Sequence, residues 1–183
     1  MRTLVVYESM FGNTHRVAER IAAGLAAAGE ARAVPVAEAT DEALEGIDLL
    51  VVGGPTHVHG MTSARSRQAA HDQAVRPGSG LTMDPDAEGP GLRDWFDQRR
   101  LPHACAAAAF DTRMHGAPAL TGRASKGIAK RLARHGARLV ADPESFIVDR
   151  DNHLDDGEAE RAGAWGASLA EACRSAMTEG RHG

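Results

Sequence analysis

Short apolar runs alternate along the chain with longer segments in which apolar residues recur at helical spacing. The run at residues 47–53 is apolar on both faces, which is typical of a strand inside a parallel sheet. Pro35 cannot donate a ladder hydrogen bond, so we expect the run that contains it at a sheet edge. The expected strands are residues 3–7, 31–36, 47–53, 104–110 and a fifth one that Asp142 and Pro143 divide into 138–141 and 145–149.

The segments between these runs have the pattern of amphipathic helices. In residues 14–28, Val17, Ile21 and Leu25 fall on one side, and Gly29 follows at the end. The alternation of strands and helices predicts an α/β fold, in which a doubly wound parallel sheet carries helices on both faces. The expected helices are residues 14–28, 41–45, 61–76, 91–100, 122–135 and 156–177.

Three loops at the carboxyl ends of the expected strands form the candidate binding region. In a doubly wound sheet the ligand lies beyond these ends, where the strand order reverses. The loops after strands one, three and four are residues 8–15, 54–60 and 111–121, and we expect them to lie close together. The long segment 61–91 follows the second loop directly, so we expect it to form a lid or a docking surface beside the site.

Composition narrows the classes of partner. The chain has 183 residues, 43% of them hydrophobic, and a formal net charge of −4, which fits one globular domain. No basic cluster favours nucleic acid, and no apolar run approaches the roughly 20 residues of a membrane span. Cys105 and Cys173 are expected to be free thiols, and no targeting segment fits before the first strand, so we expect a cytoplasmic protein.

The first loop, ESMFGNTH at residues 8–15, carries groups suited to an anion. Ser9, Asn13 and Thr14 offer uncharged donors, and Gly12 permits backbone angles at which successive N–H groups converge. The positive end of the following helix favours a phosphate at the same place. Because Asn and Thr are also ordinary capping residues, a capped turn without a ligand is the alternative. Neither G-x-x-x-x-G-K-[ST] nor G-x-G-x-x-G occurs at this junction, which weakens NTPase and dinucleotide interpretations.

The segment VVYESMFGNTHRVAERIAAGL resembles the opening of flavodoxin-like proteins, whose phosphate loop is usually T/S-x-T-G-x-T. Ser9, Gly12, Asn13 and Thr14 match this pattern, and Phe11 replaces its middle Thr. GGPTHVHG and FDTRMHG stand where the family's second and third flavin loops occur, and DGEAERAGAWGASLA resembles its last helix. The resemblance implies a flavodoxin-like fold, with a five-stranded parallel sheet in the order 2-1-3-4-5, and FMN as the cofactor.

The resemblance also implies which residues contact FMN. The hydroxyl of Thr56 is suited to polar atoms of the flavin, and Arg113 is expected either to stabilise negative charge on the reduced ring or to pair with Asp111. The cofactor-binding residues expected from the three loops are Ser9, Met10, Phe11, Gly12, Asn13, Thr14, Pro55, Thr56, His57, Val58, His59, Gly60, Asp111, Thr112, Arg113 and Met114.

The same resemblance sets the expected domain limits. Residues 1–178 are expected to form a single flavodoxin-like domain with an insert at about 61–91 next to the flavin site, and residues 179–183 a flexible tail. Flavodoxins usually stack Trp or Tyr side chains on the flavin, and neither residue type stands in these loops. We expect His57, Met114 or Trp95 to take this place.

His57 and His59 form a His-x-His pair, which also occurs in metal sites. No third His lies nearby and no H-x-x-x-H pattern is present, so we expect no metal here. A polar surface loop without any ligand is the other alternative for residues 53–61.

Three functions remain open. The leading interpretation is an FMN-binding electron carrier, a monomer or homodimer, between a reductase and an acceptor such as a monooxygenase. The P-T-x-x-x-G pattern at residues 55–60 and the long insert favour instead an NAD(P)H-dependent FMN enzyme that reduces small quinones. The replacement at Phe11 and the missing aromatic residues favour a flavin-free module with a binding or regulatory role. The net charge of −4 makes this chain less acidic than electron-carrying flavodoxins tend to be.

Overall fold

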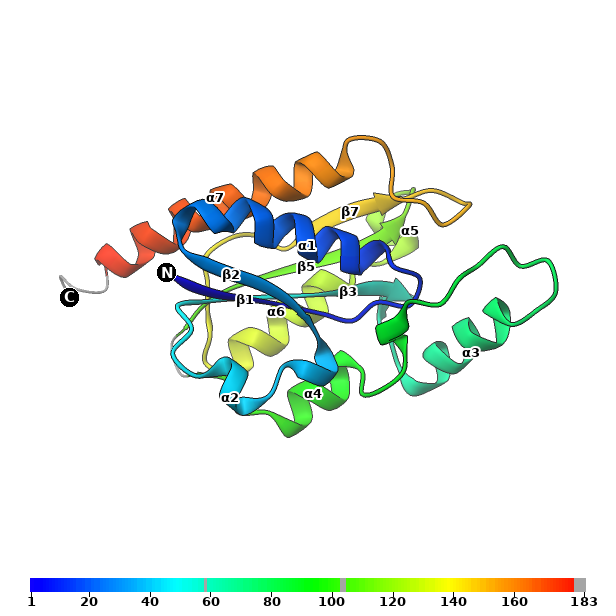
Figure 1. Cartoon of the computed structure of the whole chain (residues 1–183), viewed down its shortest axis with the longest axis horizontal. Coiled ribbons are helices and arrows are strands. Elements are labelled where there is room, and N and C mark those ends of the chain that lie inside the picture. Colours follow the sequence, from blue (N-terminus) through cyan, green and yellow to red (C-terminus); the bar gives the residue numbers. More distant parts are fainter. Residues whose placement is uncertain (58, 103–104, 180–183) are drawn as a thin grey trace.

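The computed structural model describes residues 1–57, 59–102 and 105–179, and it has one central sheet between two layers of helices (Figure 1). Its strands are β1 (Arg2–Tyr7), β2 (Glu30–Pro35), β3 (Leu49–His57), β4 (Gly60–Met61), β5 (Ala106–Met114), β6 (Arg138–Leu139) and β7 (Glu144–Val148). They follow the order β2-β1-β3-β5-β6, in which β4 pairs with β3 and β7 pairs with β5. The pair of β3 and β4 is antiparallel, and the other pairs are parallel.

This sheet confirms the predicted doubly wound order but has more strands than the predicted five. The fifth position is divided between β6 and β7, because Pro143 has no N–H to continue a ladder. The additional strand β4 arises where the chain turns back on the end of β3, so that His57 pairs with Gly60. Pro35 lies at the end of the edge strand β2, as its missing N–H predicts.

The helices in the described part of the chain are α1 (Asn13–Leu25), α2 (Asp41–Leu44), α3 (Ala64–Ala74), α4 (Leu92–Gln98), α5 (Pro118–Thr121), α6 (Ala124–Arg134) and α7 (Glu158–Glu179). In Figure 1, α1 and α7 lie above the sheet, and α2, α4 and α6 lie below it. Two separate cores result, because one face of the sheet packs against α1 and α7 and the other against α4 and α6. The one-turn helix α5 is absent from the sequence-based prediction.

Two strands extend beyond their predicted ends into segments that were expected to be loops. The strand β3 begins at Leu49 rather than at residue 47 and continues to His57, and β5 continues to Met114. The parallel ladder between them reaches Pro55 opposite Thr112, which supplies backbone partners along these residues. Residues 53–57 and 111–114 are therefore strand ends rather than loops, and their side chains alternate between the two faces of the sheet.

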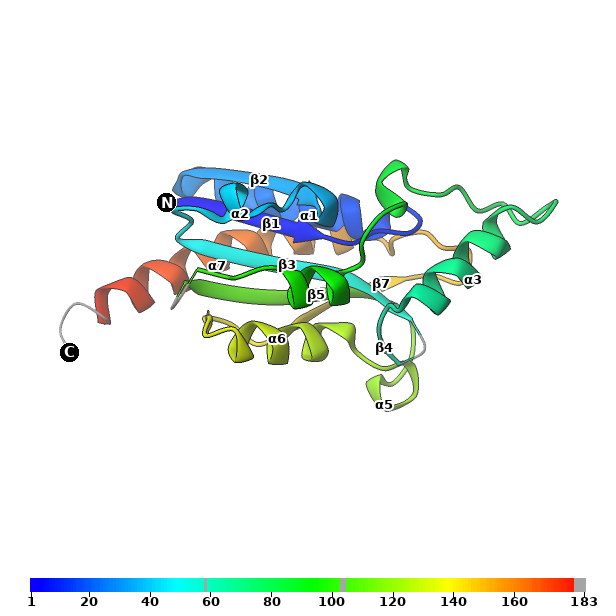
Figure 2. The ribbon, with the colours of Figure 1, turned by 90° about the horizontal axis from the view of Figure 1, so that it is seen from below.

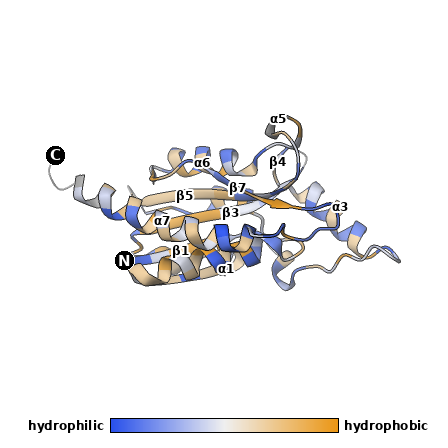
Figure 3. Ribbon diagram, turned by 90° about the horizontal axis from the view of Figure 1, so that it is seen from above, coloured by the Kyte–Doolittle hydropathy of each residue, from blue (hydrophilic) through white to orange (hydrophobic). Residues whose placement is uncertain are grey.

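The segment 61–91 lies mostly outside both cores. Its helix α3 projects beyond the carboxyl ends of the strands, beside the end of β3 (Figure 2). Ala70 is the buried residue of α3, and α3 with the chain after it is largely hydrophilic, whereas the central strands are apolar (Figure 3). The capping box that Ser63 and Ser66 form fixes the start of this helix.

No helix within the described residues has both the length and the hydropathy needed to cross a membrane. Cys105 and Cys173 are buried free thiols, as predicted. The expected tail at 179–183 begins inside α7, which continues through Glu179, and residues 180–183 lie outside the described part of the chain.

Candidate functional site

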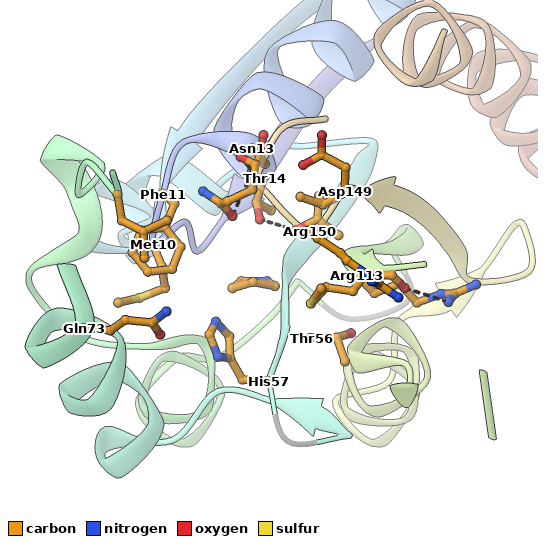
Figure 4. Close-up of a pocket in the computed structure, with 16 residues that line it drawn as sticks. Met10, Phe11, Asn13, Thr14, Thr56, His57, Gln73, Arg113, Asp149 and Arg150 are labelled. Carbon is orange, nitrogen blue, oxygen red and sulfur yellow. Dashed lines mark hydrogen bonds between the residues drawn. The ribbon is translucent and has the colours of Figure 1, made fainter. Parts of the chain in front are cut away.

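A cavity of about 360 Å³ lies at the carboxyl ends of β1, β3 and β5 (Figure 4). The three predicted loops meet there, since residues 10–11, 13–14, 55–57 and 112–114 all contribute to its wall. The residues that line it are Met10, Phe11, Asn13, Thr14, Pro55, Thr56, His57, Gln73, Leu81, Thr112, Arg113, Met114, Val148, Asp149, Arg150 and Asn152. Ten of the predicted contact residues are therefore brought around one cavity.

Gly12 fixes the shape of the first loop. Its φ of 89° is in the left-handed region that favours glycine, and its N–H donates to Oγ of the buried Ser9 over 3.1 Å. The first backbone bond of α1 runs from the N–H of Arg16 to the carbonyl of Gly12. The N–H groups that come before this bond, in the first turn that begins at Asn13, have no acceptor within the helix. They are therefore available to an anion.

Two threonine hydroxyls join the first loop to β5. Thr14 Oγ1 and Thr112 Oγ1 lie 2.7 Å apart, and both residues are buried. In such a pair one hydroxyl donates to the other, which leaves the hydrogen of the accepting hydroxyl free for a further bond. The amide of Asn13 instead donates to the carbonyl of Asn152 over 2.9 Å, so this predicted ligand donor also holds the turn after β7.

The side chain of Asp111 is held by neighbouring groups of the protein, and the role predicted for this residue in cofactor binding stays a prediction. Asp111 is fully buried, and its Oδ2 accepts from Thr56 Oγ1 over 3.0 Å and from the N–H of Ser125 over 2.8 Å. The hydroxyl of Thr56 also accepts from the N–H of Ala124 over 2.8 Å. Because its hydrogen is committed to Asp111, the Thr56 hydroxyl can only accept from a flavin, not donate to it.

Arg113 does not form the ion pair with Asp111 that the sequence offered as one alternative. Its Nη1 donates to the carbonyl of Gly116 over 2.9 Å and to Oγ1 of Thr121 over 3.1 Å. These bonds tie the end of β5 to α5. The Arg113 side chain lines the cavity while its guanidinium is held by the chain itself.

Five predicted contact residues are not among the described residues that line the cavity. A sixth, Val58, is not part of the described chain. Ser9 and Asp111 are buried and bonded within the protein, and Gly12 shapes the loop through its backbone. His59 forms a bridge with Gly122, and Gly60 belongs to β4. Trp95 is also wrong as a stacking residue, since it is buried and its Nε1 donates to the carbonyl of Ala39 over 2.7 Å.

Two parts of the wall are missing from the sequence-based prediction. Gln73 and Leu81 come from the insert, and Val148, Asp149, Arg150 and Asn152 come from the end of β7 and the turn after it. The run DRDN at 149–152 is a turn signal directly after a strand, so it could have been found. Asp149 Oδ1 accepts from the N–H groups of Asp151 and His153, which shapes this turn.

The side chains in the cavity combine apolar surface with few charges. Phe11, Met10 and Gln73 lie together near His57, and Arg150 and Arg113 lie across the cavity from them (Figure 4). Burial lowers the pKa of His57, and the nearby carboxylate of Glu8 opposes this shift only in part. The imidazole of His57 is therefore kept neutral at neutral pH.

Comparison with known proteins supports the flavodoxin-like fold. The flavodoxin family model matches residues 5–83, which include the first loop and β3. None of the curated proteins matches the chain. A flavodoxin from the domain Archaea has a similar structure, with a TM-score of 0.64 and 18% identity, over 95% of this chain and 99% of that one.

Two bacterial structures are similar to a comparable degree. Flavodoxin 1 from Bacillus cereus has a TM-score of 0.65 and 18% identity, and the match covers 93% of this chain and 98% of that one. A flavodoxin, WrbA-like protein from Agrobacterium tumefaciens has a TM-score of 0.56 and 21% identity over 95% of this chain and 98% of its own. The strand order and these solved structures show a flavodoxin-like fold, and the part of the chain that matches the family model, residues 5–83, includes the phosphate-type first loop.

Proposed function

We propose that this protein binds FMN in the cavity and transfers electrons between a reductase and a redox partner in the cytoplasm. The observation that carries the proposal is that the glycine-shaped first loop and the ends of β3 and β5 border one cavity. Its volume of about 360 Å³ is within the usual range for sites that hold a cofactor. When bound, FMN supplies one- and two-electron redox chemistry, and the protein supplies binding, orientation and electrostatics.

The first-loop side of the cavity fits the phosphate of FMN. The N–H groups at the start of α1 provide donors and the positive end of the helix dipole. The hydroxyl pair of Thr14 and Thr112 retains one free hydrogen for a phosphate oxygen. Arg150 lines the same cavity and supports the binding of a dianion by its charge. The missing threonine hydroxyl at Phe11 is therefore offset by groups that lie far away in the sequence.

The wall formed by the ends of β3 and β5 fits the flavin ring. Pro55, His57 and Met114 offer apolar and polarisable surface from the strand ends, and Phe11 and Leu81 belong to the same wall. Arg113 is the charged residue of β5 in the cavity, and it is suited to stabilise negative charge on the reduced ring. A Trp or Tyr is not required for this contact, because Phe11 supplies an aromatic side chain.

Flavin content is the first test of this proposal. The purified chain is expected to be yellow or to bind one FMN per chain when titrated, with quenching of FMN fluorescence. Gly12→Val strains the loop at a φ of 89° and so displaces the N–H groups at the start of α1. Loss of one hydrogen bond to a charged group costs about 1.5–3 kcal/mol, so the FMN affinity is expected to fall about tenfold or more.

Gly157→Val is the matched control for this experiment. Gly157 also has a positive φ, of 81°, has open space at its Cβ position, and does not line the cavity. Its substitution introduces comparable backbone strain, but FMN affinity is expected to remain that of the unaltered protein. Equal FMN affinity in the Gly12→Val variant and the unaltered chain would contradict the placement of the phosphate.

The quinone-reductase alternative is favoured by one observation, the neutral His57 imidazole inside the cavity. A ring nitrogen there can hydrogen-bond an oxygen of a quinone that approaches the flavin. Rapid NADPH oxidation with a benzoquinone and no added reductase, slowed in His57→Gln, would favour this enzyme. Electron transfer only after addition of a separate reductase would favour the carrier, and failure to bind FMN would favour the flavin-free module.

A further inference from the structure

A cluster of ligating side chains lies outside the cavity, on the other side of the first loop. His15 extends from the first turn of α1, and Asp84 and Asp86 come from the end of the insert, in and before a short 3₁₀ turn at Pro85–Ala87. One ligand atom from each of these three residues lies within 4.8 Å of the other two. We propose that His15, Asp84 and Asp86 bind a divalent transition-metal ion, with Zn²⁺ as the closest chemical fit.

The Asp84 carboxylate is the main evidence for a ligand. Its side chain is only 1% exposed, and its Oδ1 accepts from the N–H of Asp86 over 3.0 Å. Its Oδ2 accepts no hydrogen bond from the described part of the chain, although it is buried. A buried carboxylate oxygen without a donor is costly unless a cation neutralises it. This oxygen faces His15, so the unsatisfied charge points into the cluster.

The distance between the two innermost ligands fits a shared metal ion. Asp84 Oδ2 lies 3.4 Å from Nδ1 of His15. A charge-assisted hydrogen bond between such groups is shorter, at about 2.7–2.9 Å. Two ligands that are each about 2.1 Å from one tetrahedral Zn²⁺ lie about 3.4 Å apart. The observed separation therefore suits coordination better than direct hydrogen bonding, and the exposed side chain of Asp86 can turn to complete the set.

The groups behind the ligands are those that metal sites typically use. The Tyr7 ring stacks on the His15 ring with centroids 4.5 Å apart, and the Tyr7 hydroxyl donates to Asp86 Oδ2 over 2.9 Å. Nε2 of His15 lies 3.6 Å from the exposed carboxylate of Glu19 on the next turn of α1.

A bound ion has an access route and a structural consequence. An open groove along α1, lined by His15 and Glu19 among others, exposes the outer side of the cluster. The N–H of Asp84 donates to the carbonyl of Met10 over 2.9 Å, so the end of the insert already touches the first loop. Coordination by residues from both segments would fasten the insert to α1, and the chain is therefore expected to become more stable when the ion binds.

Titration of the EDTA-treated full chain with Zn²⁺, followed by isothermal calorimetry, tests this inference. We expect one Zn²⁺ per chain and a rise in melting temperature on saturation. His15→Gln and Asp86→Asn are each expected to weaken binding at least about tenfold, and Tyr7→Phe about tenfold through the loss of its bond to Asp86. His71→Gln and Asp97→Asn change exposed residues elsewhere and are expected to bind like the unaltered chain.

The variants are chosen so that folding and flavin binding do not obscure the result. His15 and Asp86 do not line the FMN cavity, so FMN affinity, measured in parallel, is expected to be unchanged in both variants. Asp84→Asn changes a buried residue, and this variant is not needed if it fails to fold. Zn²⁺ binding by the variants at the exposed Asp86 and the partly exposed His15 then tests the inference. No Zn²⁺ binding by the folded chain, or equal binding by His15→Gln and the unaltered chain, would overturn the inference.

Discussion

The contact between α1 and α7 and the cavity end of the sheet are held together in opposite ways. Between the helices, Gly24 approaches the backbone so closely that a Cβ would lie 2.0 Å from the carbonyl oxygen of Gly163. At the cavity end, Asp111, Thr56 and the pair of Thr14 and Thr112 are joined by hydrogen bonds between side chains and backbone.

This difference shows that one region stabilises the fold and the other forms the site. The helix contact consists of close apolar packing, whereas the cavity end places polar groups at the end of the apolar core. Polar groups that are satisfied by each other are rigid, and those with a remaining donor or acceptor can bind. The first loop belongs to the second kind, because the N–H groups at the start of α1 have no helical partner.

The largest effect is expected when the polar support of the cavity end is removed. Asp111→Ala leaves the N–H of Ser125 and the hydroxyl of Thr56 without their acceptor, and Ser125 is fully buried. The free energy of unfolding is expected to fall by roughly 2–4 kcal/mol, as measured by urea denaturation. Asp97→Ala, on the exposed side of α4, is the control and is expected to change stability by less than about 0.5 kcal/mol.

A smaller loss is expected at the helix contact. Gly24→Ala inserts a methyl group against the carbonyl of Gly163, and such overpacking costs typically about 1–3 kcal/mol. Gly163→Ala changes the same interface, but its Cβ would lie 3.6 Å from the carbonyl of Arg20, an ordinary contact. This control is expected to stabilise by about 0.5–1 kcal/mol through helix propensity. Equal thermal stability of the two variants would refute the close approach.

The smallest effect concerns the pH dependence of stability. Burial lowers the pKa of His57 below the value of about 6.5 that it has when unfolded. As the pH falls through 6.5, the unfolded chain binds a proton that the folded chain resists, so His57 makes the protein less stable in acid. His57→Gln is expected to make the free energy of unfolding, measured by urea denaturation, depend less on pH between about pH 7 and pH 5. The loss of stability that it removes is up to about 1.4 kcal/mol per unit of pKa shift.

His71→Gln serves as the control for this pH series, because His71 is exposed on α3. The free energy of unfolding of this variant is expected to change with pH as that of the unaltered chain does. A His57→Gln variant with the same slope as the unaltered protein would show that His57 is not kept neutral by the fold.

The sequence by itself determined the alternation of strands and helices and the position of the first loop. Apolar runs such as residues 47–53 are typical of a buried parallel strand, and a glycine with capping residues after the first run favours a phosphate-type junction. These features are local, so they can be read without knowing what the segments contact. Leu92, Trp95 and Phe96 recur at helical spacing and are all buried in the core, so this local pattern favoured burial of Trp95 over a place in the cavity.

Only the tertiary structure decided which side chains share a site. The lengths of β3 and β5 depend on their mutual ladder, and that ladder turns Asp111 inward while His57 and Met114 border the cavity. Arg150 joins the wall from a loop more than a hundred residues after the first one. His15 and Asp84 are likewise about 70 residues apart, so no local spacing could reveal their contact. Distances between such segments are set by chain folding and packing, which a periodic pattern does not contain.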